Sequence, residues 1–156
     1  MRKIPSVLAA LGVAALGVVI PAGTAQAAAG CSGAWDGAND GEMKAYRYSY
    51  CDTHLGTTES YDSDWGNSSG PFQGTDENAA TSLLHKGTSG YAIAFYRLPG
   101  YDGGHICLTK GEKWASTLVD GADSYANDRF TNGDPADNRI SSHQWVSQSS
   151  CGKFMH

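Results

Sequence analysis

Two short polar segments carry the side chains best suited to binding a metal ion. Glu77–Ser82 and Asp137–Ser142 share one order: an acidic residue, Asn, two free positions, Ser or Thr, then Ser. Calcium takes six to eight oxygen ligands. Side-chain oxygens come from Glu77, Asn78, Thr81, Asp137, Asn138 and Ser141, and backbone carbonyls from the free positions Ala79 and Arg139. These oxygens suit a hard cation of this kind, which would be held weakly because each segment has one carboxylate.

No enzymatic chemistry is expected from the remaining polar residues. The five histidines show no helical pair with an intervening Glu, as a zinc protease needs; they are His54, His85, His105, His143 and His156. Gly87–Gly90 lacks the second glycine of a nucleophile elbow and is interpreted as a turn. Two acidic pairs are interpreted as solvated loop residues: Asp62 with Asp64, and Asp120 with Asp123. Strand alternation makes His143 a neighbour of Trp145 rather than a base.

The chain contains an internal repeat. The two hexapeptides are offset by 60 residues (77 to 137). Upstream, Ala34–Gly41 and Phe95–Gly103 each place an aromatic residue before a glycine-rich turn that ends in Asp-Gly, with an offset of 62 (41 to 103). Because two motifs recur in the same order at nearly the same offset, we expect two related structural units.

These motifs resemble those of the βγ-crystallin superfamily. Tyr96-x4-Tyr101-x-Gly103 is similar to the superfamily's folded corner, in which glycine takes a positive φ, and both hexapeptides resemble its calcium motif. Glu77 departs from the motif, and Trp35 is one residue too close to Gly41. Within the superfamily, the chain is most similar to small secreted actinobacterial proteins of peptidase inhibitor family I36.

The resemblance implies that each calcium site is shared between the repeats. One site would join Ala79 and Thr81 to Asn138 or Asp137, and the other would join Arg139 and Ser141 to Asn78 or Glu77. The alternative is that the Ser and Asn side chains only hydrogen-bond the loop backbone.

Short strands separated by turn residues predict an all-β fold. Strands are expected over Glu42–Cys51, with Tyr46, Tyr48 and Tyr50 on one face, and over Tyr91–Arg97, His105–Thr109 and Ser141–Val146. Gly56–Asp76 is expected to be an irregular loop, and Glu112–Val119 has some helical character. We expect a disulfide-stabilised, βγ-crystallin-like Greek-key β-sandwich over residues 28–156, with repeats at about 31–86 and 87–147.

The first 27 residues match a secretory signal peptide. Arg2 and Lys3 precede an apolar run, Val7–Ile20, and Ala25–Ala27 supplies the small residues of a cleavage site. The run is short for a membrane anchor, and Ala28 is a poor match to a lipoprotein signal before Cys31. We expect a secreted, extracellular protein.

Four cysteines in an exported chain favour disulfides, and three pairings are possible. We favour Cys31–Cys51, closing a hairpin that turns near Asp40-Gly41, and Cys107–Cys151. Since no two cysteines lie two to four residues apart, a zinc ribbon is not expected.

Charge narrows the classes of partner. The formal charge is −5, and removal of Arg2 and Lys3 takes it to −7, so neither nucleic acid nor an anionic membrane is an expected partner. We expect a monomer. The family resemblance implies an extracellular protease as partner. By their length, the loops Gly56–Asp76 and Asp120–Asp134 are the candidates for contacting it. The alternatives are a calcium-stabilised structural or envelope protein without a protease target, and a secreted toxin.

Overall fold

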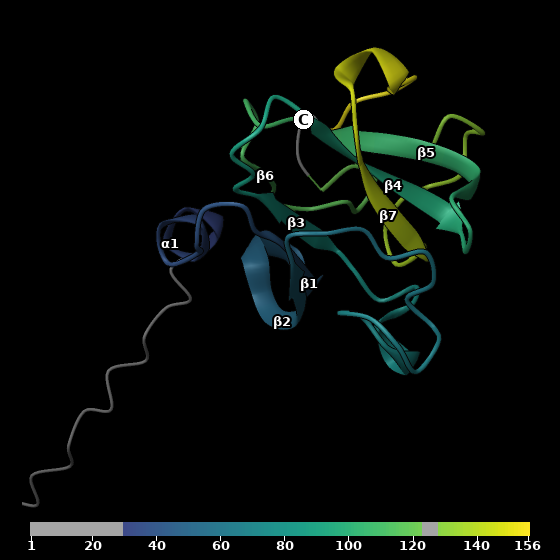
Figure 1. Cartoon of the computed structure of the whole chain (residues 1–156). Helices are drawn as coiled ribbons and strands as arrows, with labels where there is room; N and C mark the ends of the chain where they lie inside the picture. Colours follow the sequence, from purple (N-terminus) through teal and green to yellow (C-terminus); the bar gives the residue numbers. More distant parts are fainter. Residues whose placement is uncertain (1–29, 123–127) are drawn as a thin grey trace, which may run out of the picture.

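Two antiparallel sheets make up the computed structural model, which describes residues 30–122 and 128–156 (Figure 1). The first sheet has the order β2-β1-β3-β6 and the second β5-β4-β7. The strands are β1 (Met43–Tyr48), β2 (Asp52–Thr58), β3 (Ser82–His85), β4 (Ala92–Leu98), β5 (Asp102–Leu108), β6 (Trp114–Ala115) and β7 (Ser142–Val146). The helical segments are α1 (Gly30–Asp36) and the short 3-10 turns η1 (Ser49–Cys51), η2 (Gly74–Asp76) and η3 (Gln148–Ser150). The expected all-β fold of two antiparallel sheets is confirmed.

The two halves of the chain exchange segments between the sheets. After the β1–β2 hairpin, the chain crosses to the second sheet, where Asp62 pairs with His143 of β7 through two backbone hydrogen bonds of 3.0 and 2.8 Å. Conversely, β6 belongs to the second half of the chain but pairs with β3 in the first sheet. This exchange is the Greek-key connection expected for the fold, and it holds the two sheets together.

The core lies between the sheets. Aliphatic side chains from β1 and β3 meet those from β4 and β5, as the two-residue period of a strand requires. The largest buried side chains of this cluster include Trp65, Phe72, Phe95 and Phe130. Trp65 and Phe72 come from the crossing segment, so the long loop contributes core residues rather than lying wholly in solvent.

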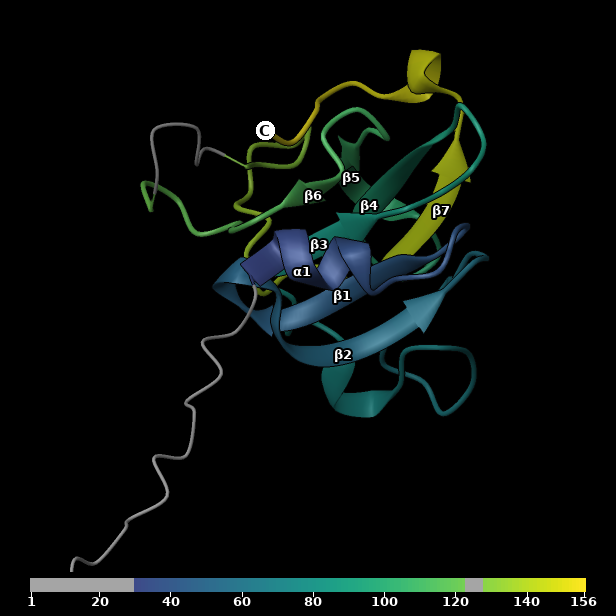
Figure 2. The same cartoon turned by 90° about the vertical axis from the view of Figure 1, so that its left-hand side faces the viewer.

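A disulfide-linked terminal segment covers the outer face of each sheet. Helix α1 lies across the first sheet (Figure 2), where Ala34 and Trp35 pack on Tyr46 and Leu84. Cys31 of α1 bonds Cys51. On the second sheet, Cys107 bonds Cys151, and Phe154 packs beside that bond. The favoured pairing of the cysteines is therefore the one that forms.

Several local expectations were wrong. Gly30–Asp36 forms helix α1 instead of one arm of a hairpin. The strand expected over Glu42–Cys51 ends at Tyr48, so Tyr50 lies beyond β1 and does not continue the strand face of Tyr46 and Tyr48. Its φ of 62° turns the chain there.

Three further elements differ from their prediction. Gly56–Thr58 belongs to β2 and not to the irregular loop. The segment with helical character, Glu112–Val119, contains β6, because those residues complete the first sheet. The strand expected over Tyr91–Arg97 spans Ala92–Leu98, and its Ala92 and Ala94 are as buried as the residues facing the core, since the C-terminal segment covers them.

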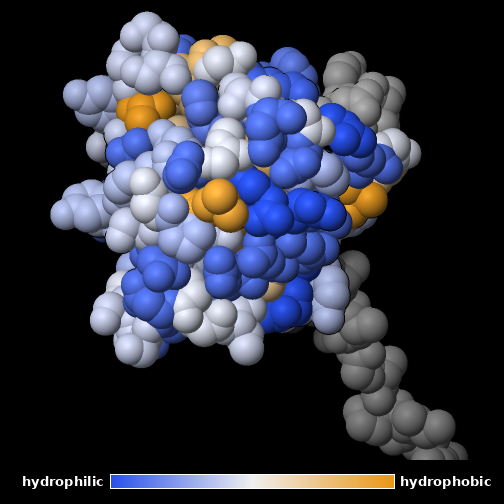
Figure 3. Space-filling model, turned by 90° about the vertical axis from the view of Figure 1, so that its right-hand side faces the viewer, coloured by the Kyte–Doolittle hydropathy of each residue, from blue (hydrophilic) through white to orange (hydrophobic). Residues whose placement is uncertain are grey.

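The predicted signal peptide, residues 1–27, and Asp123 lie outside the described residues. None of the helices in the described ranges combines the length and apolar character needed to cross a membrane. Figure 3 shows one face of the molecule, where hydrophilic residues predominate and apolar ones are scattered.

Candidate functional site

The two hexapeptides lie side by side at the seam between the sheets. The backbone amide of Asn78 donates to the carbonyl of Ile140 at 2.9 Å, and the amide of Asn138 donates to the carbonyl of Ala80 at 3.0 Å. Each asparagine takes a positive φ, 55° for Asn78 and 52° for Asn138, a conformation that asparagine tolerates better than most residues. These reciprocal bonds relate the two hexapeptides, and so the two halves of the chain, by a local two-fold.

Both hydroxyl residues of the hexapeptides are buried beneath the asparagines. The amide of Thr81 donates to the carbonyl of Tyr46, and the amide of Ser141 donates to that of Tyr96, each at 2.9 Å. These bonds tie the residue before β3 to Tyr46 and the residue before β7 to Tyr96. The hydroxyls therefore lie at fixed positions that the backbone determines.

Each buried hydroxyl faces the asparagine of the other hexapeptide. The Oγ1 of Thr81 lies 3.5 Å from the Oδ1 of Asn138, and the Oγ of Ser141 lies 3.4 Å from the Oδ1 of Asn78. Ordinary O–H···O bonds measure about 2.5–3.0 Å. Two oxygens bound to one calcium ion at about 2.4 Å and a right angle are about 3.4 Å apart, so this spacing fits a shared calcium ion.

The acidic residues of the hexapeptides lie to the side of these oxygen pairs. One carboxylate oxygen of Asp137 accepts from the Nδ2 of Asn138 at 3.0 Å, and the other, Oδ1, is buried without a hydrogen-bond partner among the described residues. The carboxylate of Glu77 packs against Gly66. The asparagines, rather than Asp137 or Glu77, are thus the residues that the structure brings to the opposite hydroxyls.

The oxygen chemistry of the site suits a hard cation. The candidate ligands are side-chain oxygens of Thr81 and Asn138 on one side, and of Ser141 and Asn78 on the other, with the free positions Ala79 and Arg139 beside them. Within residues 30–122 and 128–156, the hexapeptides included, no group of three or more His, Cys, Asp or Glu side chains is placed to hold a metal ion.

The serine that ends each hexapeptide fixes a folded corner. The Oγ of Ser142 donates to the carbonyl of Leu98 and accepts from the amide of Tyr101, at 2.7 and 3.2 Å. The Oγ of Ser82 makes the same two bonds, to Tyr48 and Cys51, at 2.6 and 2.9 Å. The corner of the first half therefore follows β1, and its predicted position at Trp35–Gly41 was wrong.

The first corner is hard to recognise in the sequence because two of its residues differ in type from those of the second corner. Cys51 stands where the second corner has Tyr101, and Thr53 stands where it has Gly103. Thr53 keeps the positive φ, 55° against 78° for Gly103. Tyr46 lies as far before Thr53 as Tyr96 lies before Gly103, and this spacing was the usable signal. Without the glycine, however, the pattern is not recognisable.

A buried histidine fixes the segment that crosses between the sheets. The Nε1–H of Trp65 donates to the Nδ1 of His143 at 2.9 Å, so the Nε2 of His143 carries the proton and donates to the carbonyl of Ser60 at 3.0 Å. Both ring nitrogens are engaged in the neutral form. Burial lowers the pKa of His143 to about 4, and the imidazole serves as a structural link rather than as a base.

Acid is expected to destabilise the fold through His143. In the unfolded chain this histidine takes up a proton below its ordinary pKa of about 6.5, whereas in the folded chain it stays neutral down to about pH 4. Stability is then lost as pH falls through this window, by about 3 kcal/mol for this group. Urea unfolding at a series of pH values measures the loss, and the exposed His156→Gln is the control that should leave it unchanged. An imidazole of His143 that titrates near pH 6.5 in the folded protein, followed by NMR, would contradict this account.

Comparison with known proteins assigns no family to the chain. No family model and no curated protein matches the chain. A solved structure described as "Evolution of the eye lens beta-gamma-crystallin domain fold" matches with a TM-score of 0.49 and 14% sequence identity, covering 70% of this chain and 89% of that chain. The finer resemblance, to peptidase inhibitors of family I36, has no counterpart among these matches.

Proposed function

We propose that the chain is a secreted, non-enzymatic βγ-crystallin-like protein whose two weak calcium sites stabilise the contact between its halves. One site is held by Thr81 with Asn138, and the other by Ser141 with Asn78, each completed by the neighbouring backbone carbonyl at Ala79 or Arg139. The observation that carries the proposal is the pair of hydroxyl–amide oxygen distances, 3.5 and 3.4 Å, at two positions related by the local two-fold.

The surroundings of the sites support this proposal. The hydroxyls are buried and the asparagines lie at the surface, so a cation can enter from solvent and contact donors that are already in place. The Oδ1 of Asp137, which has no hydrogen-bond partner among residues 30–122 and 128–156, adds negative charge next to Asn138. A bound ion adds stability because it would bridge residues of both halves and is absent from the unfolded chain.

Calcium is expected to raise the melting temperature. With a Kd of about 1 mM, typical of extracellular modules, about 10 mM calcium adds about 1.4 kcal/mol per site. Two sites then raise Tm by about 10 °C for a domain of this size. Calorimetry with and without calcium measures the shift, and magnesium, which prefers a smaller octahedral site, should give a smaller one.

The matched variant is Asn78→Gly with Asn138→Gly. Glycine accepts the positive φ at both positions, so the variant loses the ligand oxygens without backbone strain. We expect it to fold and to lose the calcium-dependent rise. If the variant keeps the full rise, or the parent protein shows none, the proposal fails.

Inhibition of an extracellular protease is a second proposal, favoured by the structure of one predicted loop. The carboxylate of Asp62 accepts from the amides of Asp64 and Phe72, at 3.0 and 3.2 Å, and closes the base of the loop. Trp65 stacks on Phe72 with ring centroids 4.0 Å apart. The residues between them, Asn67–Pro71, are exposed. A loop held rigid at its base loses little entropy on docking.

Activity assays test this second proposal. Purified protein is mixed with secreted serine and metalloproteases, and residual activity is measured with and without Asp62→Asn, which weakens the base of the loop. Inhibition that the variant relieves supports a role for the loop. No inhibition at micromolar protein, with calcium present or absent, removes the proposal and leaves the calcium sites unaffected.

A further inference from the structure

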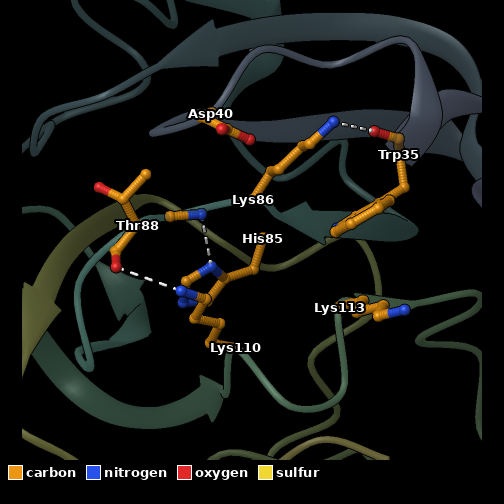
Figure 4. Close-up of a pocket in the computed structure, with 8 residues that line it drawn as sticks. Trp35, Asp40, His85, Lys86, Thr88, Lys110 and Lys113 are labelled. Carbon is orange, nitrogen blue, oxygen red and sulfur yellow. Dashed lines mark hydrogen bonds between the residues drawn. The ribbon is translucent and has the colours of Figure 1, made fainter.

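A basic pocket lies at the C-terminal end of β3, whereas the hexapeptide Glu77–Ser82 lies at its N-terminal end. Its volume is about 360 Å³, and its walls come from α1, from the turn that follows β3 and from the turn before β6. The residues that line it are Trp35, Asp40, His85, Lys86, Gly87, Thr88, Lys110 and Lys113 (Figure 4).

Positive charge is concentrated here in a chain that is otherwise acidic. Three of the nine basic side chains in the described ranges, Lys86, Lys110 and Lys113, line this pocket, against one carboxylate, that of Asp40. None of the three lysines has an ion-pair partner among residues 30–122 and 128–156; the salt bridges there involve Lys44, Arg97 and Arg129. Three ammonium groups that share a pocket with a single carboxylate repel one another, and a bound anion relieves this repulsion.

The three lysines have different local partners. Lys86 donates to the carbonyls of Trp35 and Ala38, at 2.9 and 2.8 Å, so it caps the C-terminal end of α1. Lys110 donates only to the carbonyl of Thr88, at 3.1 Å. Lys113 lies 4.7 Å from the centre of the Trp35 ring and has no hydrogen-bond acceptor in the described part of the chain. Lys110 and Lys113 are therefore the groups with donor capacity left for a ligand.

Trp35 supplies an aromatic wall. Its ring is held by the ammonium of Lys86 at 4.5 Å and that of Lys113 at 4.7 Å, and Figure 4 shows the ring between these two side chains. The indole Nε1–H is buried and has no hydrogen-bond partner among the described residues. A buried donor without an acceptor is unfavourable by about 1–3 kcal/mol.

His85 adds no charge to the pocket. Its Nδ1 accepts from the amide of Gly87 at 3.0 Å, so its Nε2 donates to the carbonyl of Tyr91 at 3.1 Å. Burial lowers the pKa of this imidazole, which favours the neutral form. The charge of the pocket thus comes from the lysines and Asp40.

We propose that this pocket binds a small organic oxyanion, whose carboxylate, sulfate or phosphate group contacts Lys110 and Lys113 while its body packs beside Trp35. The ligand is a small molecule because the pocket holds only a few hundred cubic ångströms. The site is separate from the calcium sites, and the two proposals stand independently.

The test is an NMR titration that follows the indole N–H signal of Trp35. The probes are glucuronate, glucose, inorganic phosphate and sulfate; glucuronate and glucose share a ring and differ in the carboxylate. We expect saturable shifts of the Trp35 signal with at least one oxyanion and none with glucose. The order among the three oxyanions identifies the preferred acid group.

Two variants and a control separate a built site from general attraction to lysine. Lys113→Gln and Lys110→Gln should each weaken binding at least tenfold, as expected for loss of one charge-assisted hydrogen bond. Lys153→Gln, which removes a lysine outside the pocket, should leave the affinity unchanged. The proposal is overturned if no oxyanion gives a saturable shift, if glucose shifts the signal as much as glucuronate, or if Lys153→Gln weakens binding as much as Lys113→Gln.

Discussion

Replacing Trp65 with alanine is expected to lower the free energy of unfolding by about 3–5 kcal/mol, the range for removing a large buried aromatic side chain. Trp65 is fully buried, stacks on Phe72 and meets Phe95 edge-on at a centroid distance of 6.4 Å. It comes from the segment that crosses to the second sheet, so its loss weakens the contact between the halves as well as the core. Urea denaturation monitored by circular dichroism measures the change.

Trp65→Phe is the matched control, because it keeps most of the aromatic packing and removes the N–H that donates to His143. We expect a smaller loss, about 1–3 kcal/mol, from the unsatisfied acceptor. The freed Nδ1 should also raise the pKa of His143. A loss below 1 kcal/mol for Trp65→Ala would show that the crossing segment is not part of the core.

Removal of the Cys107–Cys151 disulfide is expected to be comparably severe. The bond closes a loop with a sequence separation of 44 residues, for which the chain-entropy relation gives about 4 kcal/mol. The same bond holds the C-terminal segment on β5, where the amide of Cys107 donates to Lys153 and the amide of Met155 donates to Cys107, at 2.9 and 2.8 Å. Thermal unfolding of Cys107→Ala with Cys151→Ala measures the loss.

The other disulfide provides the comparison. Cys31–Cys51 has a separation of 20 residues, which gives about 3 kcal/mol by the same relation. It ties α1 to the corner after β1, so its removal should release α1 while both sheets persist. Equal loss of sheet signal in the two double variants would contradict this assignment.

The second half of the chain could be predicted from local signals. Tyr91–Arg97 alternates in residue size along β4, and Gly103 marks the corner because few other residues accept its φ of 78°. Those signals lie within a few residues of one another. The hexapeptides were visible for the same reason, and their pairing was what the family resemblance implied.

The first half gave weaker signals because its structure depends on distant contacts. Helix α1 is short and rich in small residues, and its position is set by Cys51 and by Lys86, which bonds its final carbonyls. β6 has two residues, and only pairing with β3 makes it a strand. The partner of His143 is Trp65, 78 residues away, and no pattern in the sequence links them.

The basic pocket escaped prediction for a similar reason. Trp35, Lys86 and Lys113 are far apart in the chain, and each is unremarkable in its local sequence. Only the packing of α1 on the first sheet brings them together.

The central claim is that each calcium site takes its asparagine from the opposite half. Calcium titration of Asn138→Gly, followed by backbone amide NMR, tests it directly. We predict that amides around Thr81 lose their response to calcium while those around Ser141 still respond, and that Asn78→Gly reverses this pattern. Loss of response at the mutated hexapeptide alone, or no calcium response in the parent protein, would contradict the shared sites.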